Sequence, residues 1–304
     1  MKSSICLIIT SFVINAWAQT ELPKYDWKAT LKVVDERGQP VEGAETRVYY
    51  GQTNKFSGQS DANGIFVASH HDSVENLAFE ADKAGYYPFR MRYHLGRNYK
   101  PDKWNPAQTI LLKRIIKPIP MYAKALNTHI PTLDKPVSYD LMAGDWVAPY
   151  GKGINTDIIF TGHIDKPTPD ESNYKLTVSF PNKMDGIQEF SVPSYYLHSQ
   201  GSALRSAQEA PTDDYQPEWI QTDNRKAGRP VRTNRDLNRN YYFRVRTVLD
   251  GQGKLNSAFY GKIYGDFMHF SYYLNPTPNS RNIEFDPKQN LMKSLKEMEV
   301  VKDP

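Results

Sequence analysis

The chain has 304 residues, with 38 Lys and Arg against 34 Asp and Glu, so the formal net charge of +4 gives only a weak whole-chain field. The one cysteine, Cys6, lies in a segment that we expect to be removed. The mature chain therefore excludes disulfides, zinc-thiolate sites and a cysteine nucleophile. The 38 Tyr, Phe and Trp residues favour strands, and the 39 Pro and Gly residues punctuate them.

Residues 1–18 have the pattern of a cleavable signal peptide. Lys2 supplies the positive start, an apolar run follows, and Ala16 and Ala18 are the small residues that precede cleavage, which we predict after Ala18. The apolar run is much shorter than the roughly 20 residues that a membrane-spanning helix needs. No later segment is long and apolar enough. We therefore expect a secreted or periplasmic protein without a transmembrane segment in the mature chain.

The next hundred residues have the pattern of short strands separated by turns. Residues 27–33 alternate apolar and polar side chains, which is typical of a half-buried strand. Gly38 and Gly64 each follow an aspartate by three residues, as in tight turns. Further strands are expected at residues 46–50, 65–68, 77–81, 86–93 and 109–112. Short strands at this spacing predict a β-sandwich.

The turn residues also carry a resemblance to a known family. They are Asp35, Gly38, Pro40, Val41, Gly43 and Ala44, then Ser60, Asp61, Gly64 and Phe66, then Ala84, Gly85 and Tyr86. This order resembles the carboxypeptidase regulatory-like domains, which are prealbumin/transthyretin-like sandwiches, over residues 26–114. The resemblance implies a seven-stranded module in which these residues are structural. An Ig-like sandwich with the same turn chemistry is the alternative.

The remaining chain is predicted to be a connector and a second domain. The prolines of residues 115–140 predict an extended connector without interior strands. Residues 141–304 predict an antiparallel β-rich domain with strands near 154–164, 174–180, 187–192, 241–249, 257–267 and 268–274. A short C-terminal helix is expected over residues 288–299. Residues 199–239 form a long excursion with little periodicity. This half resembles uncharacterised secreted bacterial proteins, and that resemblance points to no particular activity.

No established catalytic motif is present. The sequence lacks a Gly-x-Ser-x-Gly elbow, a His-Glu-x-x-His pair, a phosphate-binding loop and a dinucleotide fingerprint. We therefore assign no catalytic residue, no cofactor and no metal site. The weaker candidates are His70 to Asp72 for a metal, the pair His163 and Asp165 for a metal or a base, and loop acids for calcium. Those acids are Asp140, Asp145, Asp213 and Asp214.

The strongest functional pattern combines arginine and tyrosine. Eight basic residues lie between Arg225 and Arg246, opposed only by Asp236. If the predicted strands 241–249 and 257–267 form a hairpin, Phe243, Val245, Ile263 and Phe267 face inward on one side of it. The other side would then present Arg244, Arg246, Tyr260, Lys262 and Tyr264 to solvent. Tyrosine rings stack on sugar faces and arginine forks pair with carboxylate or sulfate.

The sequence thus predicts a secreted, non-catalytic binding or structural protein, with a polysaccharide or cell-envelope component as its partner. Nucleic acid offers similar chemistry, but export argues against it as the ligand. Two alternatives stay open. One is a secreted hydrolase that uses Asp145, His163, Asp165 and the Asp213–Asp214 pair, and the other is a purely structural envelope component. The oligomeric state is not indicated.

Overall fold

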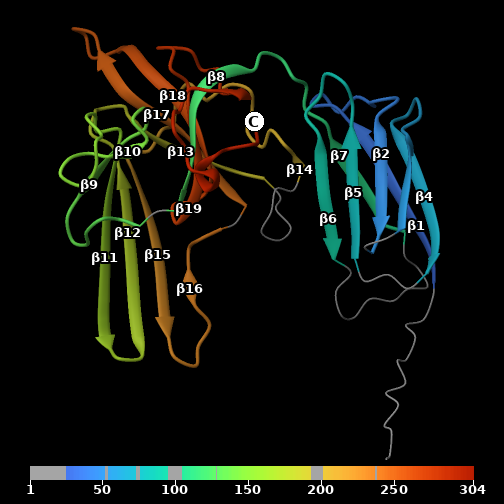
Figure 1. Cartoon of the computed structure of the whole chain (residues 1–304), viewed down its shortest axis with the longest axis horizontal. Helices are drawn as coiled ribbons and strands as arrows, with labels where there is room; N and C mark the ends of the chain where they lie inside the picture. The colour runs from blue at the N-terminus through green and yellow to red at the C-terminus, as the bar shows by residue number, and fades with distance from the viewer. Residues whose placement is uncertain are drawn as a thin grey trace, which may run out of the picture.

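The computed structural model describes residues 25–51, 54–72, 76–94, 105–127, 129–192, 201–236 and 238–304. The predicted signal peptide, residues 1–18, lies outside the described residues, and so does its cleavage position. The described part is a mainly β protein, as predicted, and its strands form two sandwiches side by side (Figure 1). Across the ranges described, no helix has the length and apolar character that a membrane crossing requires.

The N-terminal sandwich contains seven strands, the number that the resemblance implies. They are β1 (Tyr25–Val34), β2 (Glu45–Tyr50), β3 (Asn54–Gln59), β4 (Ile65–Asp72), β5 (Asn76–Asp82), β6 (Phe89–His94) and β7 (Ala107–Leu111). The one that no predicted range covered is β3. A three-stranded sheet, β4-β1-β7, packs on the sheet that contains β6-β5-β2-β3. The alternating pattern of β1 puts Trp27, Leu31 and Val33 into the core between them. A β-sandwich is therefore present where the sequence predicted one.

The turn residues act as their types suggest. Asp35 Oδ1 accepts the backbone N–H groups of Arg37 and Gln39 at 2.9 and 3.0 Å, which closes the turn after β1. Gly64 has a φ of +75°, and a Cβ atom on it would lie 2.3 Å from the Val33 carbonyl oxygen. Only glycine fits that close approach between the turn and β1.

The C-terminal sandwich is built from two six-stranded sheets. Its strands are β8 (Ile119–Asn127), β9 (Val137–Asp140), β10 (Asp145–Trp146), β11 (Ile158–Thr168), β12 (Glu171–Ser179), β13 (Gly186–Ser191), β15 (Glu218–Lys226), β16 (Arg232–Thr233), β17 (Arg239–Leu249), β18 (Leu255–Asp266), β19 (His269–Leu274) and β20 (Phe285–Asn290). The central sheet has the order β13-β17-β18-β19-β8-β20, and the ribbon sheet has the order β10-β9-β11-β12-β15-β16. Apolar and aromatic side chains from both sheets fill the core between them.

The prediction that residues 115–140 are a connector without interior strands is wrong for two segments. β8 lies inside the central sheet between β19 and β20, and β9 pairs with β11. Pro120 sits at the start of β8, before the residues Tyr122 to Asn127 that pair with β19. A proline at the first positions of a strand removes no ladder bond from that pairing.

The predicted helix over residues 288–299 is also wrong. β20 extends through Asn290, and the helical element nearby is a single 3-10 turn at Glu297–Glu299. The Asn290 side chain exchanges hydrogen bonds with the backbone of Ala123, at 3.2 Å to its N–H and 2.8 Å to its carbonyl oxygen. These tertiary contacts hold the segment extended against β8.

The long excursion contains a strap, which we define as residues 201–217, between the sandwiches. β14 (Gly201–Ser202) pairs with β6, so the strap adds an edge strand to the N-terminal sandwich. The strap then returns to the C-terminal sandwich, where Glu209 bridges to Asn282. A segment expected to be a loop therefore joins both sandwiches through backbone pairing (Figure 1).

A buried carboxylate completes the junction. Glu284 is almost fully buried, and it accepts hydrogen bonds from the Tyr87 hydroxyl at 2.8 Å and from the N–H groups of Ile116 and Lys117 at 2.8 and 2.6 Å. Nearby, Lys113 Nζ donates to the carbonyl oxygen of Ser206 in the strap at 2.8 Å. The two sandwiches are thus fixed to each other by specific polar contacts.

Candidate functional site

The hairpin of β17 and β18 has the two faces that the sequence predicts. Phe243, Val245, Ile263 and Phe267 all lie in the core between the central and ribbon sheets. On the opposite face, Arg244 lies directly across from Tyr260 in the pairing of the two strands. Up to Val245, alternation along β17 therefore separated the apolar side chains from Arg244.

The expectation that the cationic face meets solvent is wrong. Arg244 and Tyr260 are each 4% exposed, Tyr264 is 5% exposed and Lys262 is completely buried. The strap and the C-terminal segment, which we define as residues 283–304, cover this face. They form a second apolar cluster with it, to which they contribute Ala210, Tyr215, Ile283, Phe285 and Val301. A polysaccharide cannot reach these side chains in this structure.

Arg244 serves the packing of this covered face. Its guanidinium donates to the carbonyl oxygens of Met184 at 2.7 Å and Thr212 at 3.0 Å. The Tyr215 ring of the strap lies 4.6 Å from its central carbon. These contacts direct two of its five N–H donors to backbone oxygens inside the protein.

Lys262 is held without a carboxylate partner in contact. Its Nζ lies 4.9 and 4.8 Å from the ring centres of Tyr264 and Tyr273, and 3.4 Å from the Ser206 hydroxyl oxygen. Burial lowers the pKa of Lys262 well below its ordinary value, although the charge of Glu284 acts in the opposite direction. The side chain is thus a buried amine within a tyrosine cluster.

Arg246 does not share a face with Arg244. The strand is irregular between Val245 and Val248, and Arg246 takes a left-handed φ of +54°. Its guanidinium turns toward the ribbon sheet, with Nε 2.7 Å from Asp157 Oδ1 and Nη2 3.1 Å from Asp140 Oδ1. A bulge of this kind reverses the alternation, so the prediction for Arg246 is wrong.

The acids around Arg246 hold a loop. Asp140 Oδ2 accepts the N–H groups of Ile154 and Asn155 at 3.0 and 2.9 Å, and Asp145 Oδ2 accepts that of Lys152 at 2.9 Å. Burial would raise the pKa of Asp140, but these backbone donors and Arg246 lower it below its ordinary value. Both acids were calcium candidates, and their oxygens are occupied by the protein's own donors.

The histidine candidates lie in separate local contacts. His70 packs near Tyr50 and Phe56 in the N-terminal sandwich, whereas His71 on the opposite side of β4 lies 2.7 Å from Asp26. His163 forms a hydrogen bond with Asp134. In the described part of the chain, no group of three or more metal-ligating side chains is placed to hold an ion.

Two acids of the hydrolase alternative, Asp145 and Asp165, lie far apart. Asp145 pairs with Asp140 at one end of the ribbon sheet, beside the position where Ile158 of β11 pairs with β9. Asp165 lies seven residues further along β11, which corresponds to roughly 20 Å of strand. Asp165 and Asp145 therefore cannot serve as an acid and base across one bond.

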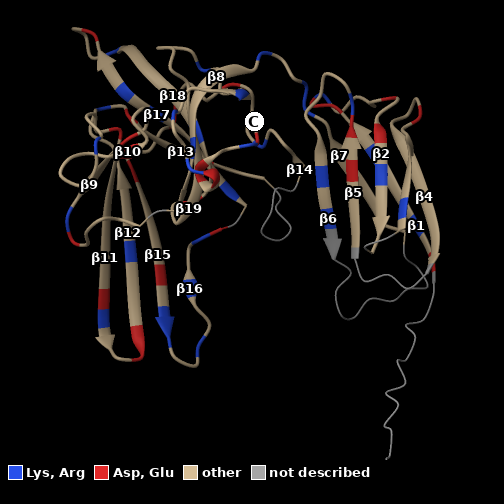
Figure 2. Cartoon of the chain, viewed as in Figure 1, with Lys and Arg blue, Asp and Glu red and all other residues tan. Residues whose placement is uncertain are grey.

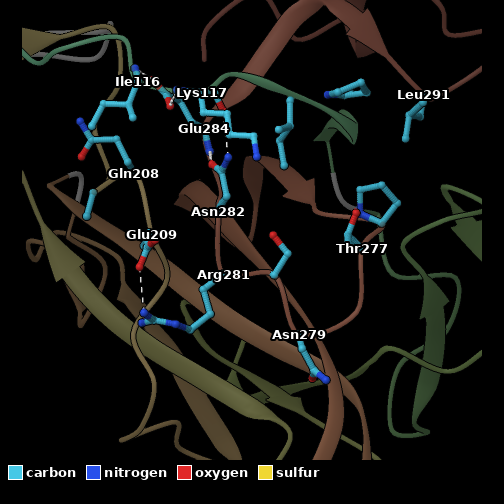
Figure 3. Close-up of a pocket in the computed structure, with 15 residues that line it drawn as sticks. Ile116, Lys117, Gln208, Glu209, Thr277, Asn279, Arg281, Asn282, Glu284 and Leu291 are labelled. Atoms are coloured by element: carbon cyan, nitrogen blue, oxygen red, sulfur yellow. Dashed lines mark hydrogen bonds and ion pairs between the residues drawn. The ribbon is translucent and has the colours of Figure 1, made fainter.

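One cavity lies at the junction of the sandwiches and has a volume of about 1120 Å³ (Figure 3). Its polar side chains already have partners. Asn282 donates to the Lys117 carbonyl oxygen at 2.8 Å, and Arg281 pairs with Glu209 at 2.8 Å. Figure 3 shows these contacts across the cavity, beside Glu284. We interpret this cavity as a joint between the sandwiches.

A second cavity, of about 820 Å³, lies beside the C-terminal segment. Its charges are of both signs, and some of them are paired. Arg235 is bonded to Asp266, and Glu299 pairs with Lys124 at 3.1 Å. The Tyr273 hydroxyl donates to the carbonyl oxygen of Asp303 at 3.3 Å. These side chains of the second cavity thus bind other groups of the protein, as those of the first cavity do.

The third cavity lies on an arm, which we define as residues 163–175 and 222–233, where the ribbon sheet extends beyond the core (Figure 2). β11 is exposed from His163 onward. The arm cavity has a volume of about 240 Å³ and is lined by Glu171, Asn173, Asn224, Arg225, Lys226, Arg229, Pro230 and Arg232. Lys226 pairs with Glu171 at 3.0 Å. Among the residues described, Arg225, Arg229 and Arg232 have no acidic partner.

The structure therefore divides the eight basic residues into two groups. Arg235, Arg239, Arg244 and Arg246 are bonded within the C-terminal sandwich. The other four are exposed on the arm. Sequence reasoning missed this division, although the turn residues Gly228 and Pro230 indicate a hairpin end at that point.

Comparison with known proteins adds no family. No protein-family model matches this sequence, and no curated protein matches it. Solved structures with some similarity include 3-chlorocatechol 1,2-dioxygenase from Rhodococcus opacus 1CP, with 10% identity over 32% of this chain and a TM-score of 0.27. A streptococcal ancillary pilin has 11% identity over 80% of this chain and a TM-score of 0.24.

A putative membrane-associated protein of unknown function from Bacteroides fragilis has 10% identity, with 85% of this chain and 100% of that chain covered, and a TM-score of 0.25. This chain spans 62% of the length of the dioxygenase chain and 60% of that of the pilin. Scores this low carry no argument about fold or function, and the architecture stands on the strand pairings.

Proposed function

We propose that this protein is an exported, non-catalytic binding protein that recognises an anionic polysaccharide through the arm. The observation that carries the proposal is the segment from Asn224 to Thr233, which contains four cations and no acid. These cations are exposed, and three of them have no acidic partner among the described residues. Exposed arginine forks bind carboxylate and sulfate groups in two-point geometry.

The rest of the molecule supports a presenting role for the two sandwiches. The N-terminal sandwich, which resembles carboxypeptidase regulatory-like modules, serves as a spacer or docking module. The signal pattern at residues 1–18 supports export to the periplasm or to the outside of the cell. The strap and Glu284 fix the sandwiches to each other, so the arm keeps one orientation relative to the N-terminal sandwich.

A purely structural envelope component is the second candidate. The same fixed junction favours it, because a load-bearing component requires a defined geometry between its parts. This candidate predicts no retention by soluble polysaccharides. The two candidates therefore differ in a single binding measurement.

The test is affinity electrophoresis of the purified mature chain through gels that contain neutral dextran, dextran sulfate or polygalacturonate. We expect retardation by the anionic polymers alone, and less of it at high salt, because exposed charges are screened. Replacing Arg225, Arg229 and Arg232 with glutamine removes three contacts of about 0.5–1 kcal/mol each and weakens binding by about tenfold or more.

The matched control replaces Lys28, Lys32 and Arg37 with glutamine. These residues are exposed on the N-terminal sandwich and produce the same change in net charge. Equal loss of binding in both variants would mean that net charge alone attracts the polymer, and the proposal would fail. New reducing ends after incubation would revive the hydrolase alternative, and an absence of retardation would leave the structural candidate.

A further inference from the structure

The arm cavity has two chemically different sides. Arg229 and Arg232 lie on one side, toward the β15–β16 turn. Glu171 lies on the other, next to the exposed acid Asp170 of the β11–β12 turn, and the exposed Asp165 of β11 lies opposite Asn173. A ligand that fits both sides has to present an anion to the first and uncharged hydrogen-bonding groups to the second.

The strand register brings a pair of amides between these sides. Asn173 of β12 lies directly opposite Asn224 of β15, which in turn lies opposite Arg232 of β16. Directly opposed residues point to the same face of a sheet, so Asn173, Asn224 and Arg232 form a row across three strands. Glu171 and Lys226 form the neighbouring row on the same face, joined by their ion pair.

The amides in this row have no side-chain partner within the described residues. An asparagine amide offers two donor hydrogens and an acceptor oxygen, which matches hydroxyl groups that both donate and accept. The row therefore offers uncharged recognition beside a cation. A simple electrostatic patch for a polyanion does not need such amides.

We propose that the arm cavity binds one uronate ring of a polysaccharide, with the carboxylate on Arg229 and Arg232 and the ring hydroxyls on Asn173 and Asn224. This inference rests on the proposed function and names its ligand class. The cavity volume of about 240 Å³ lies below the roughly 300–1000 Å³ of sites for drug-sized ligands, which suits a single ring.

The charges of the arm favour a sugar with one carboxylate over a densely sulfated one. Asp165 and Asp170 lie on the side away from the arginines, and each repels further anions on the same ring, whereas the charge of Glu171 is paired with Lys226. A uronate ring places its single charge at one position and hydroxyls elsewhere. That distribution matches the two sides of the cavity, whereas sulfate groups spread around the ring do not.

The experiment measures the affinity of the whole mature protein for a polygalacturonate oligomer, its methyl-esterified form and dextran sulfate. We expect binding to the free acid and at least tenfold weaker binding to the ester, since esterification removes the charge and keeps the hydroxyls. The variant pair Asn173→Ala with Asn224→Ala should weaken binding to the oligomer by about tenfold. Its retention by dextran sulfate should not change.

The matched control is Asn256→Ala, an exposed asparagine outside the arm, which should change neither affinity. If the amide variants bind the oligomer as tightly as the unchanged protein, or the ester binds as well as the acid, the uronate inference is overturned. Retention by dextran sulfate that depends on the arm arginines would still support the proposed function. If neither polymer retains the unchanged protein, both the uronate inference and the proposed function are overturned.

Discussion

At the scale of single residues, Lys262 is the most unusual side chain in the protein. It is fully buried among Tyr264, Tyr273 and Ser206, and no carboxylate within the described ranges contacts its amine. Removing a charged ammonium from water costs much more than two ring contacts return. The folded protein therefore favours the neutral amine.

This burial predicts an unusual dependence of stability on pH. The folded pKa of Lys262 lies well below its unfolded value, so between the two values the unfolded chain binds more protons. The free energy of unfolding then rises with pH, by at most about 1.4 kcal/mol per unit for one group. Urea denaturation between pH 7 and 9 should show this rise, because that window lies below tyrosine ionisation.

The comparison variant is Lys262→Met, which keeps the length of the side chain and removes the amine. Its unfolding free energy should lose this rise with pH. A slope that persists in Lys262→Met would show that another group is responsible. Such a result would also mean that Lys262 keeps its proton in the folded state.

Residue Lys262 also illustrates what the sequence can predict at this scale. Alternation along β17 and β18 placed Arg244 and Lys262 on one face, because side-chain direction follows the local period. Whether that face is covered depends on the strap and the C-terminal segment, which are distant in sequence. No local pattern carries that information, so the cationic side chains were predicted at the surface.

At the scale of strands, Gly261 sets how closely the central sheet can pack. A Cβ atom at this position would lie 2.2 Å from both Phe243 Cζ and the Tyr273 carbonyl oxygen. β18 contacts the neighbouring strands so closely there that a methyl group has to displace either the ring or the backbone.

We therefore expect Gly261→Ala to reduce the free energy of unfolding by about 1–3 kcal/mol, which is the usual cost of overpacking. Gly251→Ala is the matched control, because nothing lies within 4 Å of a Cβ atom there. It should stay within about 0.5 kcal/mol of the unchanged protein in urea denaturation. Similar losses in both variants would contradict this account of the packing.

The strands themselves were predictable where alternation was clean, as in β1 with its buried Trp27 and Leu31. β8 was missed because Pro118 and Pro120 argued against an interior strand. Its pairing with β19 begins only at Tyr122, beyond the prolines. Residues 288–299, which overlap only the end of β20, were assigned to a helix because Leu291, Leu295 and Met298 have helical spacing. The bonds between Asn290 and Ala123, invisible in the sequence, keep it extended.

At the scale of the whole molecule, Glu284 joins the two sandwiches. Its carboxylate accepts three hydrogen bonds, one from Tyr87 of the N-terminal sandwich and two from the segment leading into β8. A buried carboxylate with three donors is stable only while all three remain in place. The junction is thus sensitive to the loss of a single acceptor.

We expect Glu284→Gln to lower the free energy of unfolding by about 1–3 kcal/mol, because an amide NH₂ would then face a donor. Glu209→Gln, in the same cavity, breaks only the pair with Arg281, in which Glu209 is largely exposed, and should cost at most about 1 kcal/mol. Urea denaturation of the two variants provides the comparison. Equal effects would show that Glu284 does not carry the junction.

The strap has a consequence for the order in which the protein is made. The N-terminal sandwich emerges first, but its β6 edge receives β14 only after Gly201 and Ser202 have followed. Until then, the backbone donors and acceptors of that edge are open to other chains, which is a known route to aggregation. Synthesis thus passes through an interval in which the N-terminal sandwich is folded with an unprotected edge. The arrival of the strap ends that interval.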